Sequence, residues 1–157
     1  MTFIVDGMLG KLAKWLKILG FDALFMAADD DKILAVARRE GRTILSRDHE
    51  FIRSAKGHRA LLIESTHWPD QVRQVLAQFD LRTEARPFTR CLECNVLLEW
   101  LSYEGAARIV PPHVCEKTSS FSLCPCCGRV YWAGTHHSAM ESAVRELLDE
   151  SRNAGNV

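Results

Sequence analysis

The chain has 157 residues, 47% of them hydrophobic, with 20 basic and 20 acidic side chains and a formal net charge of zero. This length accommodates one ordinary domain, or one compact domain with a small additional module. The apolar fraction excludes wholesale disorder. No stretch approaches the roughly 18 apolar residues that span a bilayer, so no membrane association is expected. The net charge of zero excludes a nucleic-acid-binding protein that is basic over its whole surface, but it is compatible with a local basic patch.

The amino-terminal residues MTFIVDGML have no basic region before their apolar run and no small-residue cleavage site, so a secretory signal is not expected. We therefore expect the chain in the cytoplasm, where disulfides are rare. All six cysteines follow residue 90, and cysteines gathered in one segment of such a chain favour a metal site over a disulfide framework.

The net charge of the chain also changes near residue 90. Residues 1–90 carry 15 basic and 12 acidic side chains, a net charge of +3, whereas residues 91–157 carry 5 and 8, a net charge of −3. Together with the cysteines, this shift predicts a boundary near residue 87, with domains at 1–87 and 88–150 and a flexible tail at 151–157.

Short apolar runs alternate with helical patterns over residues 1–80. Strands are predicted at 3–5, 23–26, 43–45 and 61–63. Between and after them, apolar residues recur at helical spacing from Leu9 to Leu19, from Ile33 to Ala37 and from Val72 to Phe79. Strands alternating with helices indicate an α/β domain with a mostly parallel sheet. After residue 90 come cysteine pairs, short β-prone pieces and a final helix that includes 140–148.

Acidic side chains follow three of the predicted strands. Asp6 ends the first strand, Asp29 and Asp30 follow the second, and Asp48 follows the third, with Glu50 two residues later. Ligands of open α/β sheets bind outside the carboxyl ends of the strands, so we expect these side chains to meet. Clustered carboxylates repel one another unless a cation joins them, and hard oxygen ligands suit Mg²⁺ or Mn²⁺. The pattern predicts metal-dependent phosphodiester cleavage, with Asp6, Asp30 and Asp48 as the main ligands.

Each of these residues also has a purely structural interpretation. An aspartate at a helix start is more often only a cap, and the run Asp29–Asp31 could do no more than cap a helix and complement its dipole. Asp48 could simply close a turn. For one residue alone the structural interpretation is the commoner, so the metal hypothesis depends on the coincidence of three successive strand ends.

Basic residues near these aspartates are candidates for binding a phosphate backbone. Lys11, Lys14 and Lys17 lie three residues apart on one face of the first predicted helix, directly after Asp6, and Arg47 precedes Asp48. A solvated helix face is the commoner reason for this spacing. Further basic residues could extend the surface: Arg38, Arg39 and Arg42.

Two CxxC pairs stand in the carboxyl-terminal segment, formed by Cys91 with Cys94 and by Cys124 with Cys127. Two such pairs can present four thiolates to one tetrahedral Zn²⁺, and four protein ligands leave no open position, so this zinc would be structural. Cys126 is a rival for Cys127. A redox CxxC is the alternative, but the strand-to-helix context of a thioredoxin-like unit is absent. No role is assigned to Cys115.

His136 comes just before the final predicted helix. It could contact phosphate, orient a ligand or shuttle a proton. A surface or packed histidine at a helix start is the structural alternative.

The spaced motifs resemble the Mut-seven-type C-terminal RNase family, which is PIN-like. The resemblance starts with DGMLGKLAKWL at 6–16 and ILGFD at 18–22, and it continues through Asp29–Asp30, Glu40–Arg42 and Ser46–Asp48. It resumes in the cysteine-rich segment, most clearly at the residues CPCCGRVYW from 124 to 132. Ser46 stands where threonine is more usual and retains the hydroxyl group.

This resemblance implies a PIN-like α/β/α sandwich fused to a zinc ribbon, and a metal-dependent ribonuclease. Asp6, Asp30 and Asp48 match the acidic residues of the family, Asp29 is an adjacent alternative, and Glu50 takes the place of a further acidic group. Lys11, Lys14, Arg47 and His136 are the candidates for RNA binding. No protein partner or inhibitor is indicated, although many PIN-like nucleases act in toxin–antitoxin pairs. The rival hypotheses are a non-catalytic RNA- or protein-binding adaptor, and a metal-dependent phosphatase or DNA nuclease.

Overall fold

The structure is a computed structural model that describes residues 1–134 and 137–149. It forms two compact units, Met1–Asn95 and Val96–Val157. The domains expected at 1–87 and 88–150 remain a prediction, because compactness alone does not show which segment folds independently. The expected flexible tail, 151–157, lies outside the described residues.

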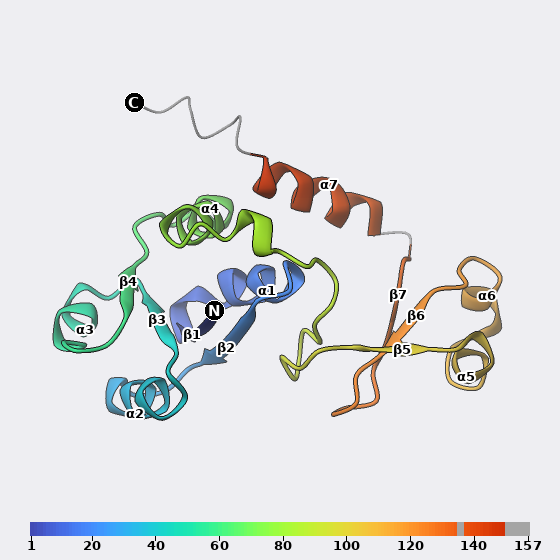
Figure 1. The fold of residues 1–157 in the computed structure, drawn as a ribbon, viewed down its shortest axis with the longest axis horizontal. Coiled ribbons are helices and arrows are strands. Elements are labelled where there is room, and N and C mark those ends of the chain that lie inside the picture. Colours follow the sequence, from blue (N-terminus) through green and yellow to red (C-terminus); the bar gives the residue numbers. More distant parts are fainter. Residues whose placement is uncertain (135–136, 150–157) are drawn as a thin grey trace. The chain divides into compact units, whose positions relative to one another are not determined.

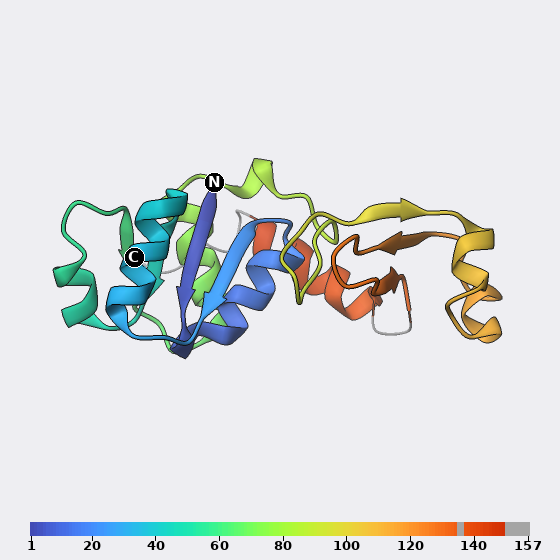
Figure 2. The same cartoon turned by 90° about the horizontal axis from the view of Figure 1, so that it is seen from below.

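A four-stranded parallel sheet forms the centre of the first unit. Its strands are β1 (Thr2–Asp6), β2 (Asp22–Met26), β3 (Thr43–Ser46) and β4 (Ala60–Leu62), in the order β2-β1-β3-β4. Figure 2 shows β1 and β2 side by side and pointing the same way. The predicted α/β class with a parallel sheet is confirmed, and all four strand ends lie at one edge of the sheet.

Helices cover both faces of this sheet (Figure 1). A short 3₁₀ turn, η1 (Gly7–Leu9), leads into α1 (Gly10–Ile18), which packs with α4 (Trp68–Gln78) on one face. The rings of Trp15 and Trp68 stack between these two helices with centroids 4.5 Å apart. On the other face, α2 (Asp30–Glu40) and α3 (His49–Ser54) cover a core that contains Ile4, Ile44 and Phe51. The unit is therefore a three-layer α/β/α sandwich.

Local sequence explains where these helices begin and end. Gly41 adopts a left-handed φ of 65° and its N–H bonds to the carbonyl oxygen of Ala37, which ends α2. Pro69 occupies the first turn of α4, where a missing N–H costs nothing. No separate helix was predicted at α3, because six residues are too few to show helical periodicity.

The second unit contains a small antiparallel sheet of β5 (Glu99–Leu101), β6 (Phe121–Leu123) and β7 (Val130–Trp132). Its short helices α5 (Tyr103–Ala107) and α6 (Pro112–Cys115) pack together, and with Phe121 they enclose a satellite core. The predicted carboxyl-terminal helix is α7 (His137–Leu148). Among the described helices, none combines the length and apolar character needed to cross a bilayer.

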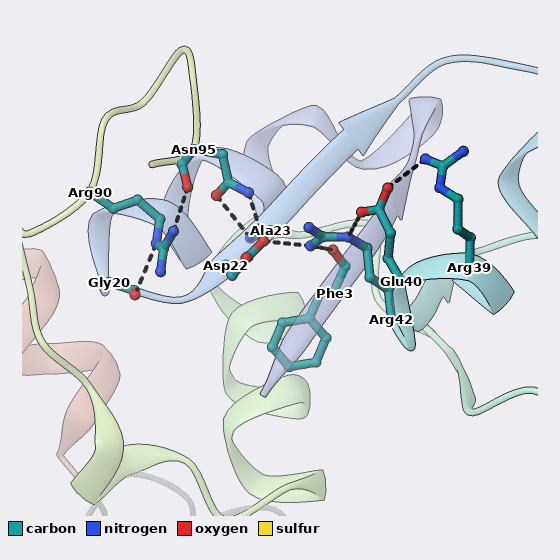
Figure 3. A network of polar contacts seen from close by, with 9 residues as sticks. All are labelled: Phe3, Gly20, Asp22, Ala23, Arg39, Glu40, Arg42, Arg90 and Asn95. Carbon is teal, nitrogen blue, oxygen red and sulfur yellow. Dashed lines mark hydrogen bonds and ion pairs between the residues drawn. The ribbon is translucent and has the colours of Figure 1, made fainter. Parts of the chain in front are cut away.

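A polar network ties the end of the first unit to its sheet (Figure 3). The Asp22 carboxylate accepts hydrogen bonds from Arg42 Nη1 and, at 2.7 Å, from Asn95 Nδ2. The Asn95 side chain also accepts a 3.0 Å bond from the backbone N–H of Ala23. Arg90 donates to the backbone carbonyl oxygens of Gly20 and Asn95. Residues 90–95 are thereby held against the start of β2.

Arg42 is the cation that pairs with Asp22 in this network, and its side chain is only 13% exposed. Besides Asp22, it donates to the Glu40 carboxylate at 2.7 Å and to the carbonyl oxygen of Phe3 at 3.1 Å. The guanidinium therefore joins the end of α2 to β1 and β2 at the edge of the sheet where these strands begin.

We expect Arg42→Ala to lower the free energy of unfolding by about 3 kcal/mol, because it leaves the partly buried Asp22 carboxylate without its cation. Arg38→Ala, which removes an exposed guanidinium from α2, should change the free energy by less than about 0.5 kcal/mol. Urea unfolding of both variants measures the difference. Equal stabilities would contradict a supporting role for Arg42.

Candidate active site

The site begins with a hydrogen bond between the last residues of two neighbouring strands. Asp6 ends β1 and Ser46 ends β3, and the Ser46 Oγ donates to Asp6 Oδ2 at 2.6 Å. Side chains alternate along a strand, so both residues lie on the face that Ile4 and Ile44 share with α2 and α3. Ser46 is fully buried and Asp6 is half-buried. The serine therefore holds the aspartate at the carboxyl end of the sheet.

Ser46 also positions the second aspartate. Its Oγ accepts a 3.0 Å hydrogen bond from the backbone N–H of Asp48. Asp48 then caps α3, because its Oδ1 accepts bonds from the N–H groups of Glu50 at 2.7 Å and Phe51 at 3.0 Å. These two bonds hold the pKa of Asp48 below its usual value. Asp48 thus has a structural role as a helix cap, rather than the turn closure predicted as its alternative, and this role uses one oxygen of the two.

The start of α2 brings the third acidic group. Asp29 stands at the N-cap position without a capping bond from its side chain, and it pairs instead with Lys32 at 3.0 Å. Asp30 is the first residue of the helix. Its pKa is raised, first by partial loss of hydration and then by the negative charges of Asp48 and Asp6.

Asp6, Asp30 and Asp48 thus follow three strands that end at one edge of the sheet, and we call this set the carboxylate cluster. It is a loose cluster. Within the described residues, the cysteines considered below are the one group whose ligand atoms all lie within 4.8 Å of one another.

Ser46 is the residue whose function the sequence did not reveal. One buried hydroxyl joins Asp6 to the backbone of Asp48. The available signal was a polar residue at the end of an otherwise apolar strand, directly before the Arg47–Asp48 pair. Its bond to Asp6 depends on the register of β1 with β3, which short runs of this kind do not specify.

The other residues predicted for this site are dispersed. Glu50 is exposed in the first turn of α3 and lines a hollow with Arg53 and Lys56. Lys11 is exposed and lines a different hollow, of about 310 Å³, with His67 and other residues that follow β1 and β4. Their contribution to a site at the carboxylate cluster remains a prediction.

Among the predicted basic residues, Lys14 is exposed on α1, and Arg47 is half-buried. The Nε atom of Arg47 is buried and has no hydrogen-bond partner in the described part of the chain. The expectation that Lys17 shares an exposed stripe with Lys11 and Lys14 is wrong, because Lys17 is 8% exposed and donates to the carbonyl oxygen of Leu92 at 2.7 Å. His136 lies outside the described residues.

Four thiols form a second group. The sulfur atoms of Cys91, Cys94, Cys124 and Cys127 all lie within 4.8 Å of one another. They are the four cysteines that the CxxC spacing selects, whereas Cys126 is not in the group. Four sulfur donors at this separation are compatible with a closed tetrahedral zinc site.

The two CxxC turns share one backbone design. The N–H of Cys94 donates to the sulfur of Cys91, and the N–H of Cys127 donates to the sulfur of Cys124, both at 3.4 Å. The residue after each pair has a left-handed φ, 62° at Asn95 and 71° at Gly128. Paired turns whose N–H groups point at thiolates are suited to a metal rather than to a disulfide.

The fold and these groups define the protein as an α/β/α sandwich with acidic residues at its strand ends and an accompanying four-cysteine group. The model of the Mut7-C RNAse domain family matches residues 1–144, and the chain belongs to this family. The predicted resemblance is therefore confirmed.

One curated relative matches part of the chain. The chain is 37% identical over 99 residues to the Exonuclease mut-7 homolog of Homo sapiens, which covers 59% of this chain. The match spans 11% of that longer protein. No solved structure matches the chain.

The charge coupling in the carboxylate cluster can be measured directly. In metal-free protein we expect Asp30 to titrate above the usual aspartate range, and Asp48→Asn to bring its pKa down, because one repelling charge is removed while the cap is retained. Carbon-detected NMR titration of the carboxyl groups reads this shift. Asp80→Asn, which removes an exposed carboxylate from the segment after α4, serves as the control. An Asp30 pKa that is unmoved by Asp48→Asn would contradict the cluster.

We expect native mass spectrometry to find one zinc ion per chain, lost in a Cys91→Ser/Cys127→Ser variant, because two thiolates cannot complete a tetrahedral site. Cys126→Ser is the matched control, since it changes the neighbour of Cys127 and should keep the ion. An intact zinc-free protein, or zinc lost with Cys126, would contradict this set of ligands.

Proposed function

We propose that this protein is a metal-dependent ribonuclease that hydrolyses RNA phosphodiester bonds at the carboxylate cluster. The observation that carries the proposal is that one buried serine bonds both to Asp6 and to the backbone of Asp48 at the carboxyl end of the sheet, while Asp30 begins the helix that follows β2. In keeping with this placement, the pKa of Asp30 is raised, first by loss of hydration and then by the charges of Asp48 and Asp6. Membership of the Mut7-C RNAse domain family points to the same chemistry.

The residues present fit a divalent ion. Carboxylate oxygens are the ligands that Mg²⁺ and Mn²⁺ prefer, and a cation would relieve the repulsion that raises the Asp30 pKa. When bound, such an ion supplies an activated water and stabilises charge on the phosphodiester. Asp6, Asp30 and Asp48 would hold it, with Asp29 as the adjacent alternative and Glu50 as a further acidic group.

The chain itself keeps two carboxylates oriented. Ser46 bonds to Oδ2 of Asp6, and the backbone of α3 bonds to Oδ1 of Asp48. In the described part of the structure, Asp6 Oδ1 and Asp48 Oδ2 make no hydrogen bond. Hydrogen bonds thus fix one oxygen of each aspartate, and the other oxygen is open to a metal ion. This lowers the conformational entropy that the side chains would lose on binding the ion. Lys11, Lys14 and Arg47 would hold the phosphate backbone beside them.

The four-cysteine group would hold a structural Zn²⁺. Four thiolate ligands would fill all four coordination positions of the ion and leave none for water. This ion would therefore stabilise the carboxyl-terminal segment and take no part in hydrolysis.

The test is cleavage of labelled single-stranded and hairpin RNA with no added ion, with Mg²⁺ and with Mn²⁺. We expect cleavage to require the divalent ion and to fall by about 100-fold or more in Asp6→Asn and Asp48→Asn, since loss of groups that only support a metal already costs about 10- to 100-fold. Chelators are avoided, because they would also remove zinc.

Asp80→Asn, the remote carboxylate control, should cleave like the wild type. Circular dichroism and zinc content establish that each variant is folded. RNA binding without cleavage would favour the non-catalytic adaptor. Equal cleavage of DNA, or hydrolysis of a phosphomonoester in place of RNA, would favour the DNA nuclease or the phosphatase.

A further inference from the structure

A basic groove runs beside α2 and has no role in the site described above. One hollow of about 500 Å³ is lined by Asp31, Leu34 and Arg38 of α2, together with Lys56 and His58 from the segment after α3. A second hollow, of about 370 Å³, shares Arg38, Lys56 and His58 and adds Arg59 and Arg42. Because they share three lining residues, the two hollows are one continuous surface, which we call the α2 groove.

The two ends of the α2 groove differ in charge. Asp31 lies in the first turn of α2, directly after the cluster residue Asp30. Arg38 lies seven residues further along the helix, about 10 Å along its axis at 1.5 Å per residue. Lys56 and Arg59 line the groove from the opposite wall. The α2 groove thus runs from Asp31, the neighbour of Asp30 in the chain, to a set of cations.

These cations are not committed to other groups. In the described residues, the side chains of Arg38, Lys56 and Arg59 make no ion pair or hydrogen bond. The nearby Glu40 is already paired, with Arg39 at 2.5 Å and with Arg42 at 2.7 Å. Arg38, Lys56 and Arg59 are exposed, so their charges face the groove and the solvent.

The occupant that fits this arrangement is a chain of phosphates. Several uncompensated cations along one groove attract a polyanion. The apolar Leu34 and Ala35 line the groove as well and can pack against sugars or bases. The acidic end would repel a phosphate unless a divalent ion neutralises the carboxylates, which places the scissile phosphate at the cluster and its neighbours along the groove.

We infer that the α2 groove binds the backbone of a single-stranded RNA that extends from the carboxylate cluster, with Arg38, Lys56 and Arg59 contacting its phosphates. This inference rests on the proposed function for its choice of RNA. It adds a binding surface on the face of the sheet opposite α1, which carries Lys11 and Lys14.

The test measures binding of a fluorescein-labelled, unstructured oligoribonucleotide by fluorescence anisotropy, between about 50 and about 200 mM KCl. Every protein carries Asp6→Asn to keep the RNA intact, and no chelator is added. Each phosphate contact to a single strand contributes about 0.7 to the slope of log affinity against log salt, so Arg38→Ala/Lys56→Ala should reduce that slope by about 1.4. At about 0.1 M salt this corresponds to roughly 25-fold weaker binding.

The matched control is Arg108→Ala/Lys117→Ala, which removes one arginine and one lysine, both exposed, from the other unit. Its slope should equal that of the parent protein. The charge-conserving Arg38→Lys/Lys56→Arg should also keep the slope, which separates lost contacts from lost folding.

Equal slopes for the groove variant and the control would overturn the inference, even if metal-dependent cleavage is observed. Absence of RNA binding by the parent protein would overturn it as well. A reduced slope for the groove variant alone would support the inference even if the wild type fails to cleave RNA, in which case only the proposed hydrolysis is lost. An acidic protein segment as the true occupant would leave the RNA slopes equal.

Discussion

Repulsion among carboxylates held at one edge of a parallel sheet is the constraint on which this site depends. Parallel strands need crossover connections, so every strand of the first unit ends at the same edge. The polar residues that follow them are brought together whether or not they attract one another. Hydrogen bonds between neighbouring residues offset this repulsion. The side chain of Ser46 bonds to Asp6 and to the backbone of Asp48, and a backbone N–H group at the N-terminus of α3 bonds to the Asp48 carboxylate.

The sequence was sufficient for the class of fold, because Val5, Leu45 and their neighbours form apolar runs that end in turn-forming or acidic residues. It was also sufficient to choose Cys127 over Cys126, since the CxxC spacing is a geometric requirement of the turn. Both inferences depend on local patterns of a few residues.

What could not be predicted depends on contacts between distant residues. Lys17 follows the same three-residue spacing as Lys11 and Lys14, yet it is buried because Leu92, 75 residues away, offers a carbonyl oxygen. The function of Ser46 depends on strand register, and the α2 groove depends on how the segment after α3 packs beside α2. The spacing of charged residues along one helix does not show which distant residues pack against that helix.

The network around Asp22 has a consequence for how the protein would acquire zinc. Asn95 and Arg90 bind the start of β2, so the turn that carries Cys91 and Cys94 is ordered by the folding of the sheet itself. Part of the entropy of assembling the ligand set is then lost before any metal arrives, so a zinc ion would bind the folded chain better than the unfolded one. Metal affinity and the stability of the first unit would then be linked quantities, and zinc supply would set how long this unit survives in a cell that degrades unfolded chains.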